Sequence, residues 1–265
     1  MNDTLPQSDP RPCAIILAAG KGTRMGSDLP KVVHPVGGRP MVSIVAEACH
    51  AVGCTPIVAV VGHGREHVER ALVDASGDIR YALQAEQLGT GHAVLAAESE
   101  LNDASPDSDV LVLCGDGPLI RDDTIRTLLD THRKANAAAT LATAAVDDPT
   151  GYGRVVRDAK GRFARIVEQK NATADELAIR EINPSYYCFK LGPLMDALRN
   201  VERNPKTGEY YLTDVPALLL AGGARVEVVE AVPAEDVLSI NTPEQLAVVD
   251  RIYRQRQNAA QGARA

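Results

Sequence analysis

The chain has 265 residues, 45% hydrophobic and 24% charged, which is ordinary for an α/β protein of one large domain or two small ones. A net charge of −7 and the absence of tryptophan disfavour nucleic-acid binding through a basic surface or aromatic stacking. No apolar run approaches the ~20 residues of a membrane span, and the five cysteines form no CxxC pair, so we expect a cytoplasmic protein with reduced thiols.

The first informative segment is an apolar run, 13–17, that leads into a glycine-rich loop, 18–31. The run predicts a buried parallel strand. Gly20 and Gly22 allow a sharp turn that directs backbone N–H groups toward an anion. The loop also carries three cations, Lys21, Arg24 and Lys31. It matches neither GxxxxGK[ST] nor GxGxxG in full. It predicts a polyphosphate site, with a simple turn bearing solvated basic side chains as the alternative.

Beyond the loop, strand-like and helix-like segments alternate. Apolar residues at helical spacing predict helices over 40–52, 65–73, 92–98 and 122–135. Buried apolar runs predict strands over 56–61, 79–83, 110–114 and 140–145. This rhythm predicts an α/β fold with a Rossmann-like, mostly parallel, doubly wound sheet. Ligands bind at the carboxyl ends of such strands, where the loop and Asp116 both fall.

The rhythm changes near residue 147. Two alternating segments, 154–157 and 162–168, predict a hairpin, and 181–190 predicts a strand of mixed polarity. We expect 147–230 to be a β-rich elaboration that receives the second substrate.

The end of the chain predicts one more helix, over 243–253, with Asn241 and Thr242 as candidate N-caps. We expect a folded unit over 12–253, with flexible ends at 1–11 and 254–265.

Further motifs decide the family. The loop reads G-x-G-x-R and then L-P-K, and it is followed in order by characteristic segments at 83–93, 115–119, 147–154, 166–170, 181–183, 208–214 and 240–241. Together they resemble the N-terminal domain of bifunctional bacterial N-acetylglucosamine-1-phosphate uridylyltransferases, over about residues 13–253. The resemblance implies the nucleotide-diphospho-sugar transferase fold. The acetyltransferase repeats of that family have no counterpart here, so we expect no acetyl transfer and a monomer or weak homo-oligomer.

The resemblance implies transfer of UMP from UTP to N-acetylglucosamine 1-phosphate, with Mg²⁺ and release of pyrophosphate. The attacking phosphate oxygen is already an anion, so catalysis reduces to placement and charge neutralisation. Arg24, Lys31 and Asp116 take the catalytic positions, and Asp116 and Asn241 are the oxygen ligands for the metal. The alternatives are surface cations at Arg24 and Lys31, a turn cap at Asp116 and a helix cap at Asn241.

The resemblance also assigns the binding positions. The nucleotide positions are Leu17, Ala18, Ala19, Gly20, Lys21, Gly22, Gln84, Gly89 and Thr90. The sugar positions are Gly115, Gly153, Glu168, Asn183, Tyr211 and Thr213. An exposed strand face for Glu168 and core packing for Tyr211 are the alternatives. His63 and His67 have metal-ligand spacing, but we interpret them as part of a strand-to-helix turn.

The chain departs from the family pattern at a few positions. Cys114 stands where tyrosine is usual, Pro184-Ser185 replaces Thr-Gly, and Gly26 and Gly117 replace larger residues. Proline removes an N–H beside the expected acetamide pocket. Glucose, glucosamine and N-acetylgalactosamine 1-phosphates therefore stay open, with a 2-acetamido sugar favoured. Another nucleotide and sugar phosphate pair, or a non-catalytic sugar-nucleotide-binding regulatory domain, are the other hypotheses. Gln84 favours UTP over CTP.

Overall fold

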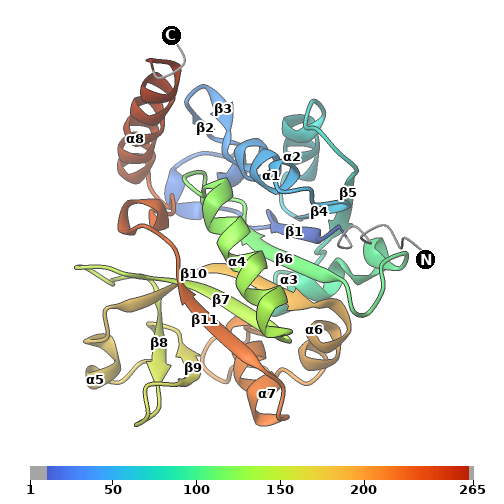
Figure 1. Cartoon of the computed structure of the whole chain (residues 1–265). Helices are drawn as coiled ribbons and strands as arrows, with labels where there is room; N and C mark the ends of the chain where they lie inside the picture. Colours follow the sequence, from blue (N-terminus) through green and yellow to red (C-terminus); the bar gives the residue numbers. More distant parts are fainter. Residues whose placement is uncertain (1–10, 263–265) are drawn as a thin grey trace, which may run out of the picture.

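The computed structural model describes residues 11–262 and contains a central sheet with helices on both faces (Figure 1). The main strand order is β11-β7-β10-β6-β1-β4-β5. The bounds are β1 Cys13–Leu17, β4 Ile57–Val61, β5 Ile79–Leu83, β6 Asp109–Cys114, β7 Ala139–Ala145, β10 Glu181–Lys190 and β11 Val226–Glu230. Strand β1 runs parallel to β4 and β6, and β10 runs antiparallel to β6 and β7. The predicted mostly parallel sheet is confirmed.

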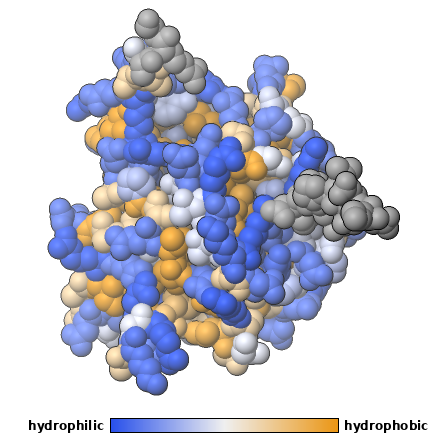
Figure 2. Space-filling model, viewed as in Figure 1, coloured by the Kyte–Doolittle hydropathy of each residue, from blue (hydrophilic) through white to orange (hydrophobic). Residues whose placement is uncertain are grey.

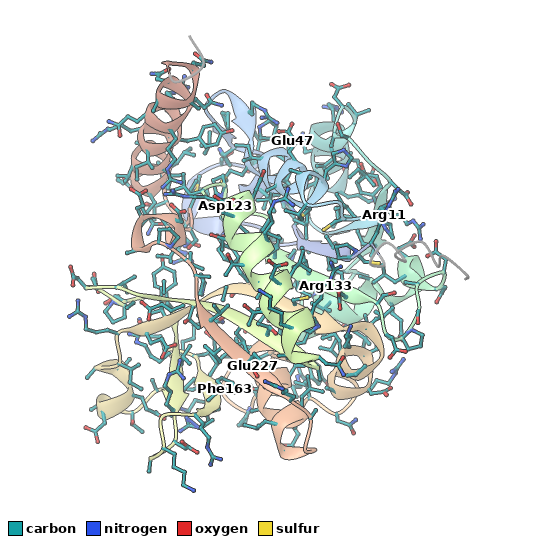
Figure 3. All side chains as sticks on the ribbon, in the orientation of Figure 1. Arg11, Glu47, Asp123, Arg133, Phe163 and Glu227 are labelled. Atoms are coloured by element: carbon teal, nitrogen blue, oxygen red, sulfur yellow. The ribbon has the colours of Figure 1, made fainter. Side chains whose placement is uncertain are left out.

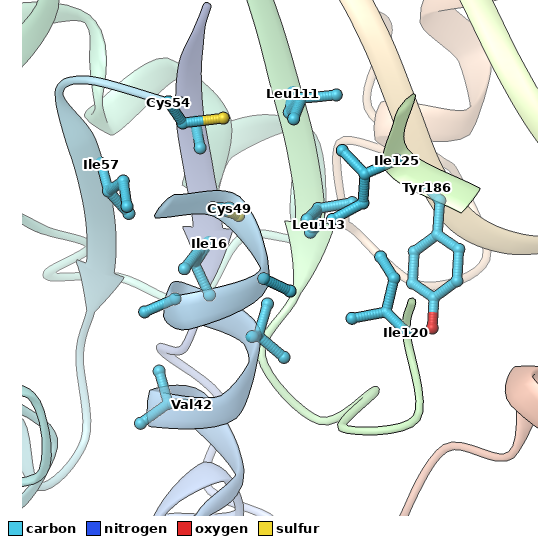
Figure 4. Packing of buried hydrophobic residues seen from close by; sticks show 14 of the residues in the cluster. Ile16, Val42, Cys49, Cys54, Ile57, Leu111, Leu113, Ile120, Ile125 and Tyr186 are labelled. Atoms are coloured by element: carbon cyan, nitrogen blue, oxygen red, sulfur yellow. The ribbon is translucent and has the colours of Figure 1, made fainter. Parts of the chain in front are cut away.

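Helices cover both faces of the sheet, as the doubly wound prediction requires. One face carries α1 Met41–Ala51, α2 Arg65–Leu72 and α4 Asp122–Ala135. The other carries α3 Thr90–Ala96, α6 Leu191–Leu198 and α7 Val215–Ala221. Because successive strand residues face opposite sides, Ile16 packs under α1 in one core cluster (Figure 4), while Ile15 packs in the other. The sequence analysis did not predict α6, α7 or β11.

Helix α4 shows why several boundaries were predictable. Its first turn carries Asp122 and Asp123 and its last turn carries basic residues, which complements the helix dipole. The helix ends at Asn136, whose φ of 46° is the left-handed conformation that terminates many helices.

Strands β8 Gly153–Arg157 and β9 Phe163–Val167 form the predicted hairpin, which is confirmed. The hairpin and α5 Ala174–Leu177 stand off the main sheet, and β8 joins it by pairing with the start of β10. The rest of 147–230 is not a separate layer. Strand β11 lies at one edge of the central sheet, and β10 lies between β7 and β6, where its Tyr187 and Phe189 are fully buried. A second, small sheet pairs β2 Pro35–Val36 with β3 Arg39–Pro40.

The last helix, α8, runs over Pro243–Gly262, so the predicted end of this helix at 253 is wrong and the helix continues through 254–262 of the expected flexible tail. Arg256 explains the extension, because it pairs with the fully buried carboxylate of Asp236 and with Glu235 at 2.7 Å. Residues 1–10 and 263–265, which include ten residues of the expected flexible N-terminal end and three of the C-terminal one, lie outside the described residues.

Polar side chains cover most of the face seen in Figure 2, with apolar residues in small groups between them. Within residues 11–262, no helix is both long enough and apolar enough to span a membrane.

A buried polar cluster lies where β6 begins. The Asp109 carboxylate, 3% exposed, accepts hydrogen bonds from Lys190 Nζ at 2.6 Å and Arg133 Nε at 2.7 Å. His132 is fully buried beside it, with Nε2 3.5 Å from Asp109 Oδ1 and Nδ1 3.0 Å from Thr140 Oγ1. Arg133 lies toward the end of α4, opposite Asp123 at its start (Figure 3). Burial would raise the pKa of Asp109, but the hydrogen bonds from Lys190 and Arg133 lower it, and burial lowers the pKa of His132 to about 4.

This cluster predicts a loss of stability in mild acid. The unfolded chain takes up the His132 proton near pH 6.5, whereas the folded chain takes it up only near pH 4. Stability is therefore lost as the pH falls through that window, by as much as about 3 kcal/mol from this group. Asp109, whose folded pKa is also lowered, acts in the same direction. Urea denaturation at several pH values measures the slope, and His132→Gln should flatten it. If stability falls equally steeply with pH in both proteins, His132 is not the source of the pH dependence.

Candidate active site

The strand ladder brings the glycine-rich loop and Asp116 together. Leu17 pairs with Cys114 in the parallel register of β1 and β6, and Gly115 N donates to Leu17 O at 3.0 Å. A side chain at Gly115 would bring a Cβ within 3.1 Å of that carbonyl oxygen. The loop and the Asp116 turn therefore leave the sheet side by side, at its carboxyl edge.

The predicted catalytic side chains meet at one point. Lys31 Nζ donates to Asp116 Oδ2 and, at 3.0 Å, to Asn241 Oδ1, while Arg24 Nη2 donates to the same Asn241 oxygen at 2.9 Å. The Lys31 and Asp116 side chains are only 18% and 15% exposed, so their ion pair is shielded from water. A side chain at Gly22 would collide with Lys31 Cβ at 2.6 Å, so the loop can fold back on Lys31 only with glycine there. We call this group the charge centre: Arg24, Lys31, Asp116 and Asn241.

The start of α8 bears on the two interpretations of Asn241. The side chain of Thr242 accepts the Gln245 N–H at 3.3 Å, which is the cap expected of a serine or threonine. Asn241 instead directs Oδ1 at the charge centre, and its backbone N–H donates to Gln245 Oε1 at 2.8 Å. Asn241 is therefore available as a ligand.

A small separate core holds three of the charge-centre segments, those of Arg24, Asp116 and Asn241, in place. Met25 adjoins Arg24, Leu119 follows the Asp116 turn and Ile240 precedes Asn241, and these three residues pack together with Val249 of α8. Arg256 reinforces this core, because Nη1 donates to Leu119 O at 3.2 Å while Nη2 reaches Asp236.

The charge centre has the chemistry of a divalent-cation site. Asp116 and Asn241 turn oxygen atoms toward the same Lys31 nitrogen, and carboxylate and amide oxygens suit a hard cation. No group of three or more His, Cys, Asp or Glu side chains in residues 11–262 could hold a metal, and His63 and His67 form no such group. A cation at Asp116 and Asn241 would therefore complete its shell with phosphate and water, as Mg²⁺ does readily.

Two compartments open on either side of Arg24. The first, of about 590 Å³, is lined by predicted nucleotide positions, namely Leu17, Ala19, Gly20, Gln84, Gly89 and Thr90. Ala18, Lys21 and Gly22 do not line it. Gln84 is 5% exposed, and its Nε2 donates to Gly89 O at 3.0 Å and lies 3.2 Å from His92 Nδ1.

The segment 208–214 forms one wall of this first compartment. Gly91 N donates to Tyr210 O at 2.8 Å, and Leu212 N donates to Thr90 Oγ1 at 3.1 Å. A Cβ at Gly89, whose φ is 102°, would lie 2.6 Å from Tyr210 O. Only glycine allows this approach.

The second compartment, of about 530 Å³, is lined by Asp116, Gly153, Glu168, Asn183 and Asn241, among others. Glu168 also lines the first, and its Oε1 accepts a hydrogen bond from Thr213 Oγ1 at 3.0 Å. Burial raises the pKa of Glu168. Glu168 is thus no exposed strand residue. Tyr211, predicted beside the sugar, lines the first compartment instead, with its hydroxyl 2.7 Å from Thr207 Oγ1. Gly115 lines neither compartment. Thr213 lines neither as well, but it contacts Glu168, which lines both.

Some lining residues escaped the sequence analysis. Gln87 Nε2 donates to Ala19 O at 2.7 Å, and Lys170 lines the same compartment. Gln87 lies in the motif at 83–93 and Lys170 in the motif at 166–170, so both could have been proposed as site residues from the sequence. Tyr152 and Ser239 line the second compartment, and Tyr152 OH donates to Val237 O at 3.0 Å. Tyr152 lies in the motif at 147–154, which does not by itself indicate a binding role for this side chain. Nothing in the sequence distinguishes Ser239 as a site residue.

Four of the five residues that depart from the family pattern line the second compartment, namely Cys114, Gly117, Pro184 and Ser185, whereas Gly26 does not. A Cβ at Gly117 would lie 2.7 Å from Tyr186 OH, so Gly117 makes room for that hydroxyl. Cys114 lines the compartment as well, and burial raises the pKa of its thiol to about 12, which keeps the thiol protonated at neutral pH.

Comparison with known proteins shows what the chain is similar to. The family model described as nucleotidyl transferase matches residues 13–237. The bifunctional protein GlmU of Clostridium acetobutylicum is 44% identical over 246 residues, and that of Pelotomaculum thermopropionicum is 48% identical over 243. These alignments cover 93% and 92% of this chain but 53% and 52% of the relatives, so the chain spans about half their length. A structure of UDP-glucose pyrophosphorylase complexed with UDP-glucose is similar in fold, with a TM-score of 0.75 at 16% identity, over 93% of this chain and all of that one.

The Arg256 contacts predict that α8 stabilises the charge-centre segments. Arg256→Gln should lower the free energy of unfolding by about 1–3 kcal/mol, because the buried Asp236 carboxylate loses one of its two arginines. Hydrogen exchange should accelerate over 234–241. Arg254→Gln is the matched control, since Arg254 pairs with Asp250 inside the same helix. Chemical denaturation measures both, and a loss in Arg254→Gln as large as that in Arg256→Gln would contradict the prediction.

Proposed function

Because the chain belongs to the nucleotidyl transferase family, we propose that it transfers UMP from UTP to N-acetylglucosamine 1-phosphate and releases pyrophosphate, with Mg²⁺. One observation carries the proposal. The charge centre brings together two cations and two metal-type oxygen ligands, and Arg24 lines both compartments, of about 590 and 530 Å³, while Asp116 and Asn241 line the second. That arrangement suits the joining of two anionic substrates.

The reaction needs placement more than proton transfer. An oxygen of the sugar phosphate attacks the α-phosphorus of UTP, the new P–O bond forms, and the bond to pyrophosphate breaks. Lys31 and Arg24 would hold the two anions against each other and offset the charge that develops on the leaving group. Asp116 and Asn241 would hold Mg²⁺, which neutralises phosphate charge when it is bound.

The orientation of the Gln84 amide supports UTP. Gly89 O can only accept, so the amide nitrogen must face it, as the 3.0 Å contact has it. The Gln84 oxygen is then left for a ligand. Uracil presents an N3–H donor to such an oxygen, whereas cytosine has no hydrogen at that position. Gln84 would therefore read the base in favour of uracil.

The second compartment would receive the sugar 1-phosphate. Glu168, held by Thr213, offers a carboxylate oxygen to sugar hydroxyls, and Asn183 offers an amide. Backbone N–H groups of the loop around Gly20 would contact the triphosphate. We also propose a cytoplasmic protein that is a monomer or weak homo-oligomer.

Pyrophosphate release tests the proposal. The chain is incubated with Mg²⁺, UTP and a panel of sugar 1-phosphates, with CTP, ATP and GTP as controls. We expect release with UTP and N-acetylglucosamine 1-phosphate. Pyrophosphate release with a different sugar 1-phosphate only would replace N-acetylglucosamine 1-phosphate as the substrate. Binding of UDP-sugars without pyrophosphate release from any pair of nucleotide and sugar phosphate would favour a regulatory domain.

Removing the carboxylate should abolish the reaction. Asp116→Ala loses the charged metal ligand, so we expect no detectable pyrophosphate release while circular dichroism stays unchanged. Asp196→Asn, which neutralises a surface carboxylate paired with Arg199, should keep full activity. Normal turnover in Asp116→Ala would refute the metal assignment.

Lys31→Ala should reduce kcat by roughly 10²–10³-fold, the usual effect of losing a group that stabilises transition-state charge. Preference among sugar phosphates should not change, because Lys31 does not line the second compartment. Steady-state kinetics measures both quantities, with Lys160→Ala on the hairpin turn as control. An altered preference at a normal rate would be the contradictory result.

A further inference from the structure

Strand β10 is irregular where it borders the second compartment. It pairs with β7 through Ile182 and resumes at Tyr186, so the register shifts across 183–185. Ser185 has a φ of 66°, a left-handed conformation that few side chains adopt. Asn183, 4% exposed, projects from this irregular segment and lines the compartment.

The two ends of the Asn183 amide can be told apart by their partners. The backbone N–H of Ser185 can only donate, and it lies 3.3 Å from Asn183 Oδ1. That atom must therefore be the oxygen. Asn183 Nδ2 then faces the Tyr187 hydroxyl at 2.6 Å and donates to it. One amide hydrogen and one oxygen lone pair remain for a ligand.

The Tyr187 hydroxyl is held rigidly. Tyr187 is fully buried, and β10 pairs it with Val112 of β6 and with Leu141 of β7. Its ring stacks on Phe189 with centroids 5.5 Å apart. A hydroxyl on such a ring cannot follow a moving partner, so Asn183 must adapt to it. Tyr187 itself does not line the compartment.

We propose that Tyr187 is a positioning residue for sugar-phosphate binding, because its hydroxyl fixes which atoms of Asn183 face the second compartment. This inference rests on the proposed function, which makes that compartment the sugar site. The donor and acceptor left on Asn183 match adjacent hydroxyls or an amide on the sugar. Without the hydroxyl, an amide N–H is unpaired in a buried place, and the amide turns away from the orientation that the sugar requires.

Kinetics of Tyr187→Phe tests the inference, because the change removes one oxygen and keeps the ring. We expect the KM for the sugar 1-phosphate to rise about tenfold, with kcat and the KM for UTP within twofold of the original chain. Calorimetry with UDP-N-acetylglucosamine should show a similar loss of affinity. Thr140→Val is the matched control. It removes a buried hydroxyl from the neighbouring strand β7, and that hydroxyl lies 3.0 Å from His132 Nδ1, away from the second compartment. It should lower Tm without changing either KM.

A double-mutant cycle separates positioning from general damage. In the Asn183→Ala background, Tyr187→Phe should add no further rise in KM, because the side chain through which it acts is gone. An unchanged KM in the single variant, or equal effects in both backgrounds, would overturn the inference. Absence of turnover in the unaltered chain would overturn the proposed function instead, before any variant is made.

Discussion

The parallel hydrogen bonding of β1 between β4 and β6 is the constraint on which the rest of the site depends. It sets Leu17 level with Cys114 on one side and with Val60 on the other. Ile15 and Ile16 are both fully buried, on opposite faces, so a slip of one residue would exchange the two cores. Core packing thus fixes the register, and the register brings the glycine-rich loop to the Asp116 turn.

The second half of the chain reaches this edge by a different means. Asn241 belongs to no strand, and it is held near Lys31 by the packing of Ile240 and by the anchored turn before it. That turn contains Asp236, whose buried carboxylate pairs with Arg121 and Arg256. Buried ion pairs gain little net free energy after desolvation, but they exclude arrangements that would leave the charge unpaired. Here the excluded arrangements are those that would move Asn241 away.

Most of the fold could be predicted from patterns within single segments, whereas the features that were missed depend on contacts between segments far apart in the sequence. Helix α4 was predictable from its own residues, because its dipole-complementing ends and apolar face lie within one segment. Helix α6 was missed because Gly192 and Pro193 resemble a break, although proline is tolerated in a first turn. The extension of α8 depends on Asp236, which precedes the helix. In the site, the motifs identified Lys31 and Asp116, but only the fold could place Tyr211 at the first compartment.

The departures from the family pattern lie on more than one element, because Cys114 and Gly117 flank Asp116 and Gly26 follows the Arg24 turn, whereas Pro184 and Ser185 lie in β10. The charge centre is held at the ends of β1 and β6 and at the start of α8, whereas Pro184 and Ser185 of the second compartment belong to the irregular part of β10. Gly117 and Tyr186 fit each other as a pair, so that change adds no strain to the Asp116 turn. Ser185 keeps the backbone N–H that orients Asn183, although its neighbour Pro184 has none. Because Pro184 and Ser185 lie on a strand that carries no charge-centre residue, this part of the wall can change shape without displacing Arg24, Lys31, Asp116 or Asn241.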